Sequence, residues 1–290
     1  MKTTNILSLF ILLSGLLFIT NCNKEDEGPT QEEINIENIV EDASIDVYSA
    51  AIHLLELADW PQENDVGIDP ADFQIMNYTK EDLGNNLMHY YFEVSVGTHD
   101  QDKIGLHRVV KQSNDQPIKT EKTFFFQHGD LKNFVGMLLP ANYSPSTSDD
   151  FGFGLYLAKN DVDVWGMDQA WCMADETTTD FSYMQGYGLN KSSKDLRTGM
   201  AIARIARYLT GNKLDKMLLA CYSSGVSTGY ALLNTETQLD NSVQNVKAYI
   251  PIDLPVISDD GPLGEYVTGD TQVNADAIAA GKYESALFFK

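Results

Sequence analysis

The sequence predicts an α/β fold. Short apolar runs typical of buried strands alternate with segments of helical periodicity along residues 85–256. One of these strands, within residues 214–234, leads directly into a sharp turn and a helix, and a serine stands in the turn. Hydrophobic residues make up 43% of the 290 residues, which is ample for a large core, and the length suits one domain with a tether.

The amino end has the composition of a secretion signal. Lys2 precedes an apolar run over residues 6–19, which is too short for a membrane-spanning helix. The junction Thr20-Asn21-Cys22 resembles a bacterial lipoprotein cleavage site, so residues 1–21 are the expected signal peptide and Cys22 is the expected lipidated residue. This resemblance implies secretion through the inner membrane and attachment to the outer membrane by the lipid on Cys22.

Residues 22–44 are polar and acidic, and we expect them to form a tether. Within them, Lys24 followed by Glu25-Asp26-Glu27 resembles the export signal of surface-displayed lipoproteins in certain Gram-negative bacteria. That resemblance implies display on the cell surface. A flexible acidic tether without an export signal explains the same residues, and both interpretations stay open.

Residues 45–84 are expected to form an amino-terminal covering segment. Helical periodicity over residues 45–57 predicts a helix, whereas the Pro, Gly and Asn residues of 60–82 predict irregular structure. The α/β core is expected to occupy residues 85–290.

Four strands are predicted in the first half of this core. Residues 89–98 and 104–111 suit an antiparallel pair. A buried strand within 121–130 ends in His128-Gly129-Asp130, and residues 162–167 form the next buried strand.

A long helix and a further strand follow. Ser192-Ser193-Lys194-Asp195 has the pattern of a capping box, which predicts that a helix begins there and ends before Gly211. Residues 246–252 predict one more strand. The apolar face of the predicted helix consists of Leu196, Met200, Ala203, Ala206 and Leu209.

The turn between the apolar run 217–220 and the helix that follows reads Cys221-Tyr222-Ser223-Ser224-Gly225. Strand and helix backbones crowd at such a turn, so it needs small residues two positions before and two positions after the serine, and Cys221 and Gly225 meet this need. The turn exposes the Ser223 hydroxyl beside a helix N-terminus. This placement suits a nucleophile and the oxyanion that it generates.

With Cys-Tyr-Ser-Ser-Gly at the turn, the chain resembles the α/β-hydrolase superfamily. Leu157, Ala158 and Asp163-Val164-Trp165 make its lipase and esterase branch the most similar part. The resemblance implies a mostly parallel, twisted sheet with helices on both faces. It also implies a serine hydrolase in which Ser223 attacks a carboxylic ester and forms an acyl-enzyme, the substrate being a small-molecule, lipid or polysaccharide ester.

The resemblance further implies an oxyanion hole. Its two donors would be the backbone N–H groups of Asp130 and Ser224, supported by His128 and Gly129. Asp130 departs from what such a site needs, because its carboxylate would oppose the developing negative charge unless the side chain points away.

The superfamily also implies a triad in the chain order Ser, then Asp or Glu, then His. Asp253, at the end of the predicted strand 246–252, is the acid candidate within the chain, although the position also suits a turn or cap residue. No histidine follows Ser223, because all five precede it: His53, His89, His99, His107 and His128. We therefore expect an N-terminal fragment that lacks the last strands and the histidine of the fold. The competing hypothesis is a non-catalytic surface lipoprotein that uses the fold as a binding scaffold.

Charge and cysteine usage exclude several other classes. The formal net charge of −22 repels phosphate backbones, so no nucleic acid partner is expected. In the implied fold one strand separates Cys172 from Cys221, which is too far for a disulfide. No His/Cys spacing indicates a metal and no Gly-rich loop indicates a nucleotide, so no metal or cofactor is expected.

Overall fold

A computed structural model describes residues 47–57, 75–97, 99–130, 132–143, 146–148 and 151–253, with a few positions between 36 and 39 and between 273 and 281. The expected signal peptide and Cys22 lie outside these residues. So does most of the expected tether. Those predictions therefore stay untested by the fold.

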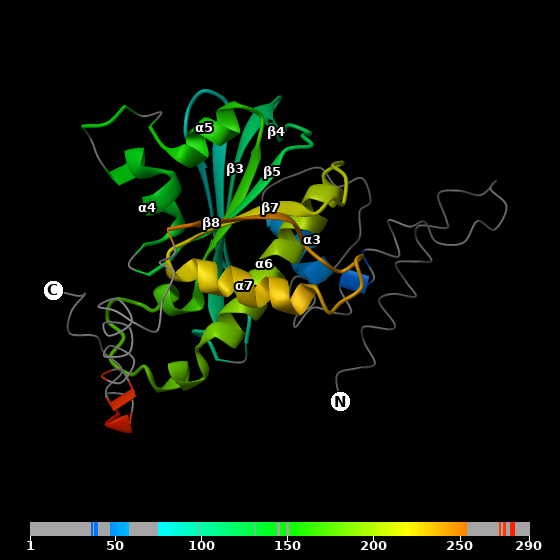
Figure 1. The fold of residues 1–290 in the computed structure, drawn as a ribbon. Helices are drawn as coiled ribbons and strands as arrows, with labels where there is room; N and C mark the ends of the chain where they lie inside the picture. Colours follow the sequence, from blue (N-terminus) through cyan, green and yellow to red (C-terminus); the bar gives the residue numbers. More distant parts are fainter. Residues whose placement is uncertain are drawn as a thin grey trace.

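A mixed, eight-stranded sheet in the order β1-β2-β3-β6-β5-β7-β8, with β4 paired to β3, forms the centre of the described part (Figure 1). Strand β5 pairs in parallel with β6 and β7, and β7 pairs in parallel with β8, whereas the pairs from β1 through β3 to β6 are antiparallel. The strands are β1 Ile75–Asp82, β2 Leu87–Ser95, β3 Lys103–Ser113, β4 Gln116–Pro117, β5 Thr123–Gln127, β6 Asp163–Asp168, β7 Met217–Tyr222 and β8 Val246–Ile252. Most described strands run in one direction, so the predicted α/β fold with a mostly parallel sheet is confirmed.

Helices cover both faces of the sheet (Figure 1). One buried cluster joins one face to α3, α6 and α7, and a second joins the other face to α4 and α5. Every helix within the described ranges is too short or too polar to span a membrane. The helices are α3 Val47–Leu57, α4 Phe134–Leu138, α5 Phe153–Lys159, α6 Leu189–Leu209 and α7 Ser224–Glu236, with 3-10 helices η2 Pro140–Tyr143, η3 Ala170–Met173 and η4 Ser182–Gly186.

Strand β5 illustrates how consecutive residues build the two cores. Phe125 belongs to the cluster under α6, whereas Phe124 and Phe126 belong to the cluster under α4 and α5, because successive side chains of a strand point to opposite faces. All three rings are almost fully buried, and each contributes about 1.5–3 kcal/mol by leaving water. This anchoring holds the end of β5, where His128 follows.

The prediction of irregular structure over residues 60–82 is wrong for residues 75–82. Residues 75–82 form strand β1, which pairs antiparallel with β2 and places Tyr78 against Phe92 at 5.2 Å between ring centroids. Most residues of β1 are exposed, so its sequence carries no apolar run that would have indicated a strand. The helix expected over 45–57 is confirmed as α3.

The predicted capping box is also wrong. Helix α6 begins at Leu189 after Gly188, and Ser193 and Asp195 are buried within it. The Ser193 hydroxyl donates to the carbonyl oxygen of Asn190, and Lys191 pairs with Asp195 one turn later at 3.0 Å. These residues therefore support the helix from inside, and the predicted apolar face and the end before Gly211, which has φ +81°, are confirmed.

A buried ionic cluster lies at the start of β6, away from the end of the strand that leads toward the predicted site. Arg108 of β3 donates two hydrogen bonds to Asp163, from Nε at 2.7 Å and from Nη2 at 2.6 Å. Arg207 of α6 donates a third from Nε at 2.9 Å. Asp163 and Arg108 are completely buried, so the two guanidinium groups and the carboxylate compensate one another away from water.

Candidate active site

Ser223 occupies a strained turn between β7 and α7. Its backbone has φ 52° and ψ −128°, a combination that a residue with a Cβ seldom adopts. The Ser223 N–H donates to the carbonyl oxygen of Ile252 at 2.9 Å, which ties the turn to the end of β8. The predicted strand, turn and helix are confirmed, with the serine at the turn.

Two glycines allow the turn to lie close to the end of β5. A Cβ on Gly225 would lie 2.4 Å from the carbonyl oxygen of His128, closer than real Cβ contacts allow. A Cβ on Gly129 would lie 2.7 Å from the Cβ of Ser223 and 2.7 Å from the carbonyl oxygen of Tyr222. The close approach of the Ser223 turn to the end of β5 thus requires glycine at both Gly129 and Gly225. The need for a small residue at Gly225 was predicted from the sequence.

The two predicted oxyanion donors come together at this junction. Asp130 follows Gly129 directly, and its N–H donates to the Ser224 hydroxyl oxygen at 3.0 Å. Ser224 is the first residue of helix α7, where backbone N–H groups have no partner within the helix. Asp130 is exposed at this position. In this arrangement the Asp130 N–H is engaged in a hydrogen bond to the Ser224 hydroxyl oxygen.

His128 is fully buried beneath the same loop, and both of its ring nitrogens have partners. Nδ1–H donates to the carbonyl oxygen of Gly129 at 2.6 Å, and Nε2 accepts the N–H of Gln169 at 3.1 Å. Burial lowers the pKa of His128, although the carboxylate of Asp168 opposes this shift. His128 is therefore a neutral imidazole whose hydrogen bonds tie the Gly129 loop to Gln169.

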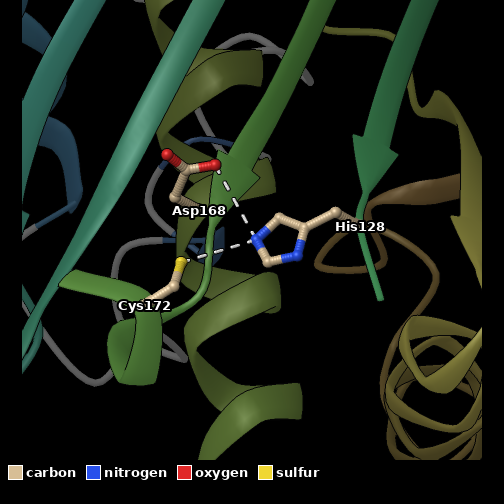
Figure 2. Close-up of side chains that lie close together, drawn as sticks. All are labelled: His128, Asp168 and Cys172. Carbon is tan, nitrogen blue, oxygen red and sulfur yellow. Dashed lines mark hydrogen bonds and ion pairs between the residues drawn. The ribbon is translucent and has the colours of Figure 1, made fainter. Parts of the chain in front are cut away.

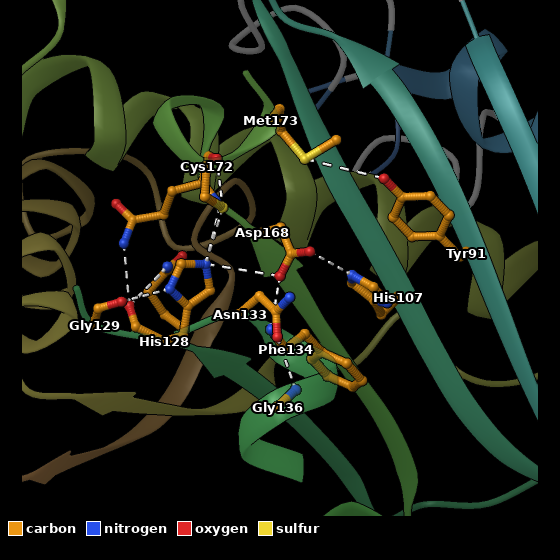
Figure 3. Close-up of polar contacts among 12 residues, drawn as sticks. Tyr91, His107, His128, Gly129, Asn133, Phe134, Gly136, Asp168, Cys172 and Met173 are labelled. Carbon is orange, nitrogen blue, oxygen red and sulfur yellow. Dashed lines mark hydrogen bonds and ion pairs between the residues drawn. The ribbon is translucent and has the colours of Figure 1, made fainter. Parts of the chain in front are cut away.

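Asp168, at the end of β6, connects the Gly129 loop to His107 of strand β3. Sequence analysis did not single it out. Its Oδ1 accepts the N–H of Phe134 at 2.7 Å, and its Oδ2 lies 3.1 Å from Nε2 of His107 (Figure 3). Burial acts to raise the pKa of Asp168, but His107 and these hydrogen bonds lower it overall. The carboxylate is thus ionised and held from two sides. Its position at the end of the apolar strand β6 is the signal that could have indicated it.

A third buried histidine, His89, lies behind His107. Nε2 of His89 is 3.0 Å from Nδ1 of His107, and the ring of Phe134 stacks on His107 at 4.5 Å. Burial, and then the neighbouring His107, lowers the pKa of His89 to about 3. His89 is therefore neutral at physiological pH, and its ring is fixed within the sheet rather than available to a substrate.

Asp253, the predicted acid, follows β8 and has φ 57°. Its neighbour Ile252 accepts the Ser223 N–H, so Asp253 lies at the same end of the sheet as the turn. Its side chain is exposed, and no contact in the described part joins it to a histidine.

The two cysteines behave as predicted. Cys172 and Cys221 are both free, and β5 separates the strands that lead to them. Burial raises the pKa of the Cys221 thiol to about 12. Burial and the Asp168 carboxylate also raise the pKa of the half-buried Cys172, whose thiol donates to the carbonyl oxygen of Gln169 at 3.0 Å.

No protein-family model and no curated protein sequence matches the chain. Among solved structures it is similar to a proposed lipase from Sulfolobus solfataricus, with 17% identity, a TM-score of 0.46 and coverage of 73% of this chain and 65% of the other. A cold-adapted esterase from an Arctic intertidal metagenomic library gives 12% identity, a TM-score of 0.41 and coverage of 69% and 71%. An inhibited esterase B from Lactobacillus rhamnosis gives 15% identity, a TM-score of 0.38 and coverage of 68% of this chain and 57% of the other. None of these proteins assigns a role to a residue of this chain.

Proposed function

We propose that the protein is a carboxylic-ester hydrolase in which Ser223 is the nucleophile. The observation that supports this most strongly is the strained backbone of Ser223, φ 52° and ψ −128°, at a turn packed against Gly129 without room for a side chain. Strain of this kind costs of the order of 1–3 kcal/mol and persists where the surrounding structure enforces it. In this turn it presents the hydroxyl beside the first turn of α7.

The proposed mechanism is acyl transfer. The Ser223 oxygen attacks the ester carbonyl while a base removes its proton, and the alcohol leaves to give an acyl-enzyme that water hydrolyses. The N–H groups of Asp130 and Ser224 would stabilise the oxyanion. For this, the Ser224 hydroxyl has to rotate away from the Asp130 N–H that it accepts at 3.0 Å.

This mechanism also requires an imidazole base. Three histidines lie in the sheet or at its end, and His128, the one beside Gly129, has both nitrogens engaged. No histidine follows Ser223 within the 290 residues. Asp253 is the acid candidate of this proposal because it lies beside the turn. Without an imidazole, Ser223 would remain a weakly nucleophilic alcohol.

A fluorophosphonate probe on the complete gene product tests this proposal. Ser223→Ala is expected to abolish labelling. Ser224→Ala is the matched control, because it keeps its backbone N–H and frees the Asp130 N–H, so labelling is expected to persist or to become faster. Equal labelling of the parent and Ser223→Ala would overturn the assignment of the nucleophile.

Occupation of the Asp130 N–H by the Ser224 hydroxyl also favours a second candidate, a binding scaffold without catalysis. Hydrolysis of a short p-nitrophenyl ester by the complete gene product, lost in Ser223→Ala, would exclude it.

We further propose that the protein is a lipoprotein anchored through Cys22 and displayed on the outer membrane. The sequence of residues 1–27 supports this. Metabolic labelling with an alkyne fatty acid should mark the parent and not Cys22→Ala. Protease treatment of intact cells should then degrade the chain if it is on the surface.

A further inference from the structure

Three side chains with metal-ligating atoms converge beside the loop that carries Gly129. They are His128 after β5, Asp168 at the end of β6 and Cys172 in η3 (Figure 2). Nε2 of His128 lies 3.7 Å from Oδ1 of Asp168 and 3.7 Å from Sγ of Cys172, and the three ligand atoms lie within 4.8 Å of one another. In a tetrahedral zinc site, bonds of about 2.0–2.3 Å put ligand atoms roughly 3.3–3.8 Å apart. Two sides of this triangle therefore have the length expected in a zinc site, and the third, between Asp168 and Cys172, is no longer than 4.8 Å.

The hydrogen bond on the far side of His128 prepares it as a ligand. Because Nδ1–H donates to the carbonyl oxygen of Gly129 at 2.6 Å, the lone pair is on Nε2, which faces Asp168 and Cys172. Zinc-binding histidines are held in this way by a carbonyl or carboxylate on the other nitrogen. Nε2 now accepts the N–H of Gln169 at 3.1 Å, and a bound ion would replace this one hydrogen bond.

Asp168 is oriented from behind in the same manner. His107 lies 3.1 Å from Oδ2, and the N–H of Phe134 donates to Oδ1 at 2.7 Å (Figure 3). Oδ1 keeps a second lone pair toward His128. His107 is itself held by His89 at 3.0 Å, so the carboxylate has two layers of support.

The charges call for a divalent cation. The Asp168 carboxylate and the Cys172 sulfur lie within 4.8 Å of each other, so a carboxylate and a thiolate at these positions would repel each other. A dication would neutralise one carboxylate and one thiolate together. Thiolate and imidazole ligands select zinc over magnesium or calcium. Cys172 is half-buried, and a zinc ion held by three protein ligands would take water as its fourth ligand.

We propose that His128, Asp168 and Cys172 form a zinc site that joins the end of β5 to the end of β6. Binding forms three ligand bonds and releases the thiol proton of Cys172 to solvent, without any change of oxidation state. The ion would lie directly behind the Gly129 loop and fix its position. The proposal does not depend on Ser223 acting as a nucleophile.

Cobalt substitution tests the site on the full chain. Co²⁺ bound to a thiolate absorbs in the near ultraviolet through charge transfer, so one equivalent of Co²⁺ should produce this band and Zn²⁺ should remove it. Cys172→Ser should lose the band, whereas Cys22→Ser and Cys221→Ser, which remove the other two of the three cysteines, should keep it. His107→Gln should keep the band and weaken Zn²⁺ binding about 10–100-fold, because it removes only support for Asp168.

Proton release separates this site from carboxylates on the acidic surface. Calorimetry of Zn²⁺ binding in buffers of different ionisation enthalpy should give about one proton released per ion, since the thiol must ionise. Surface carboxylates are already ionised at pH 7 and release none. Circular dichroism checks that Cys172→Ser is folded. Absence of the band in the parent, persistence of the band in Cys172→Ser, or zinc binding without proton release would each overturn the proposal.

Discussion

Replacing Gly225 by alanine probes the contact between helix α7 and the end of strand β5. The new Cβ would lie 2.4 Å from the carbonyl oxygen of His128 and 3.0 Å from that of Gln127. Both neighbours are backbone atoms, which cannot rotate away as a flexible side chain can. Since real Cβ atoms essentially never come within 3.0 Å of such an atom, α7 and β5 would have to separate by about 0.6 Å or more.

The cost follows from two opposing effects. Alanine is a better helix former than glycine by about 0.8–1 kcal/mol, which would favour the variant at an open helix position. Overpacking at a rigid contact costs about 1–3 kcal/mol, and contact with two carbonyl groups belongs at the upper end. We therefore expect a net loss of about 2 kcal/mol in the free energy of unfolding. If Ser223 is the nucleophile, its displacement from Asp130 should also reduce ester hydrolysis about 100-fold, because such sites tolerate little misplacement.

Urea unfolding followed by circular dichroism measures the first quantity, and hydrolysis by the complete gene product measures the second. Gly186→Ala is the matched control. Its added Cβ meets nothing within 4 Å, so its stability should stay within about 0.5 kcal/mol of the parent. A Gly225→Ala variant as stable as the parent would refute the argument that this glycine is required by the close approach of the two backbones.

Three further predictions concern buried groups. Asp163→Asn should destabilise the protein by about 3–5 kcal/mol, because it leaves the guanidinium groups of Arg108 and Arg207 without their anion; a loss below about 1 kcal/mol by urea unfolding would contradict this. The pKa of His89 is lowered from 6.5 to about 3, so the unfolded chain binds a proton first as the pH falls. The stability that comes from neutral His89 should be complete above pH 6.5 and decline toward pH 3, by up to about 1.4 kcal/mol per pH unit. In His89→Gln, the free energy of unfolding measured at pH 7, 6 and 5 should depend less on pH than in the parent. With the Cys221 pKa near 12, Cys221 in the folded chain should resist iodoacetamide at pH 8 and react in urea, and rapid modification of the folded chain by mass spectrometry would argue against its burial.

Much of the core could be predicted from the sequence because it consists of fully buried strands. Residues 123–127 and 217–222 contain apolar runs that each lead toward a helix, and such runs are the clearest signal of a central strand. Strand β1 could not be predicted, because an exposed strand with polar residues depends on its partner β2 rather than on its own pattern. The start of α6 was wrong because Ser192 and Ser193 suit a cap as well as a helix, and the neighbouring structure decided between them.

The candidate site divides in the same way. The turn at Ser223 could be predicted because its requirement for small residues at Cys221 and Gly225 is local. The cluster of Asp168 with His107 could not, because one residue lies on β6 and the other on β3, and their pairing is a property of strand order. No local spacing announces such a contact.

Strand β6 carries a buried carboxylate at each end, and this has a consequence for how uniquely the sheet assembles. Asp163 meets Arg108 and Asp168 meets His107, while Arg108 and His107 are consecutive on β3 and so point to opposite faces. If β6 shifted by one residue along β3, both carboxylates would turn to the opposite face of the sheet. Asp163 would then lose Arg108, and Asp168 would lose His107. Apolar side chains such as Val164 tolerate alternative partners, whereas uncompensated buried charges do not. The two acidic residues therefore favour one register between β6 and β3 and destabilise the registers shifted by one residue.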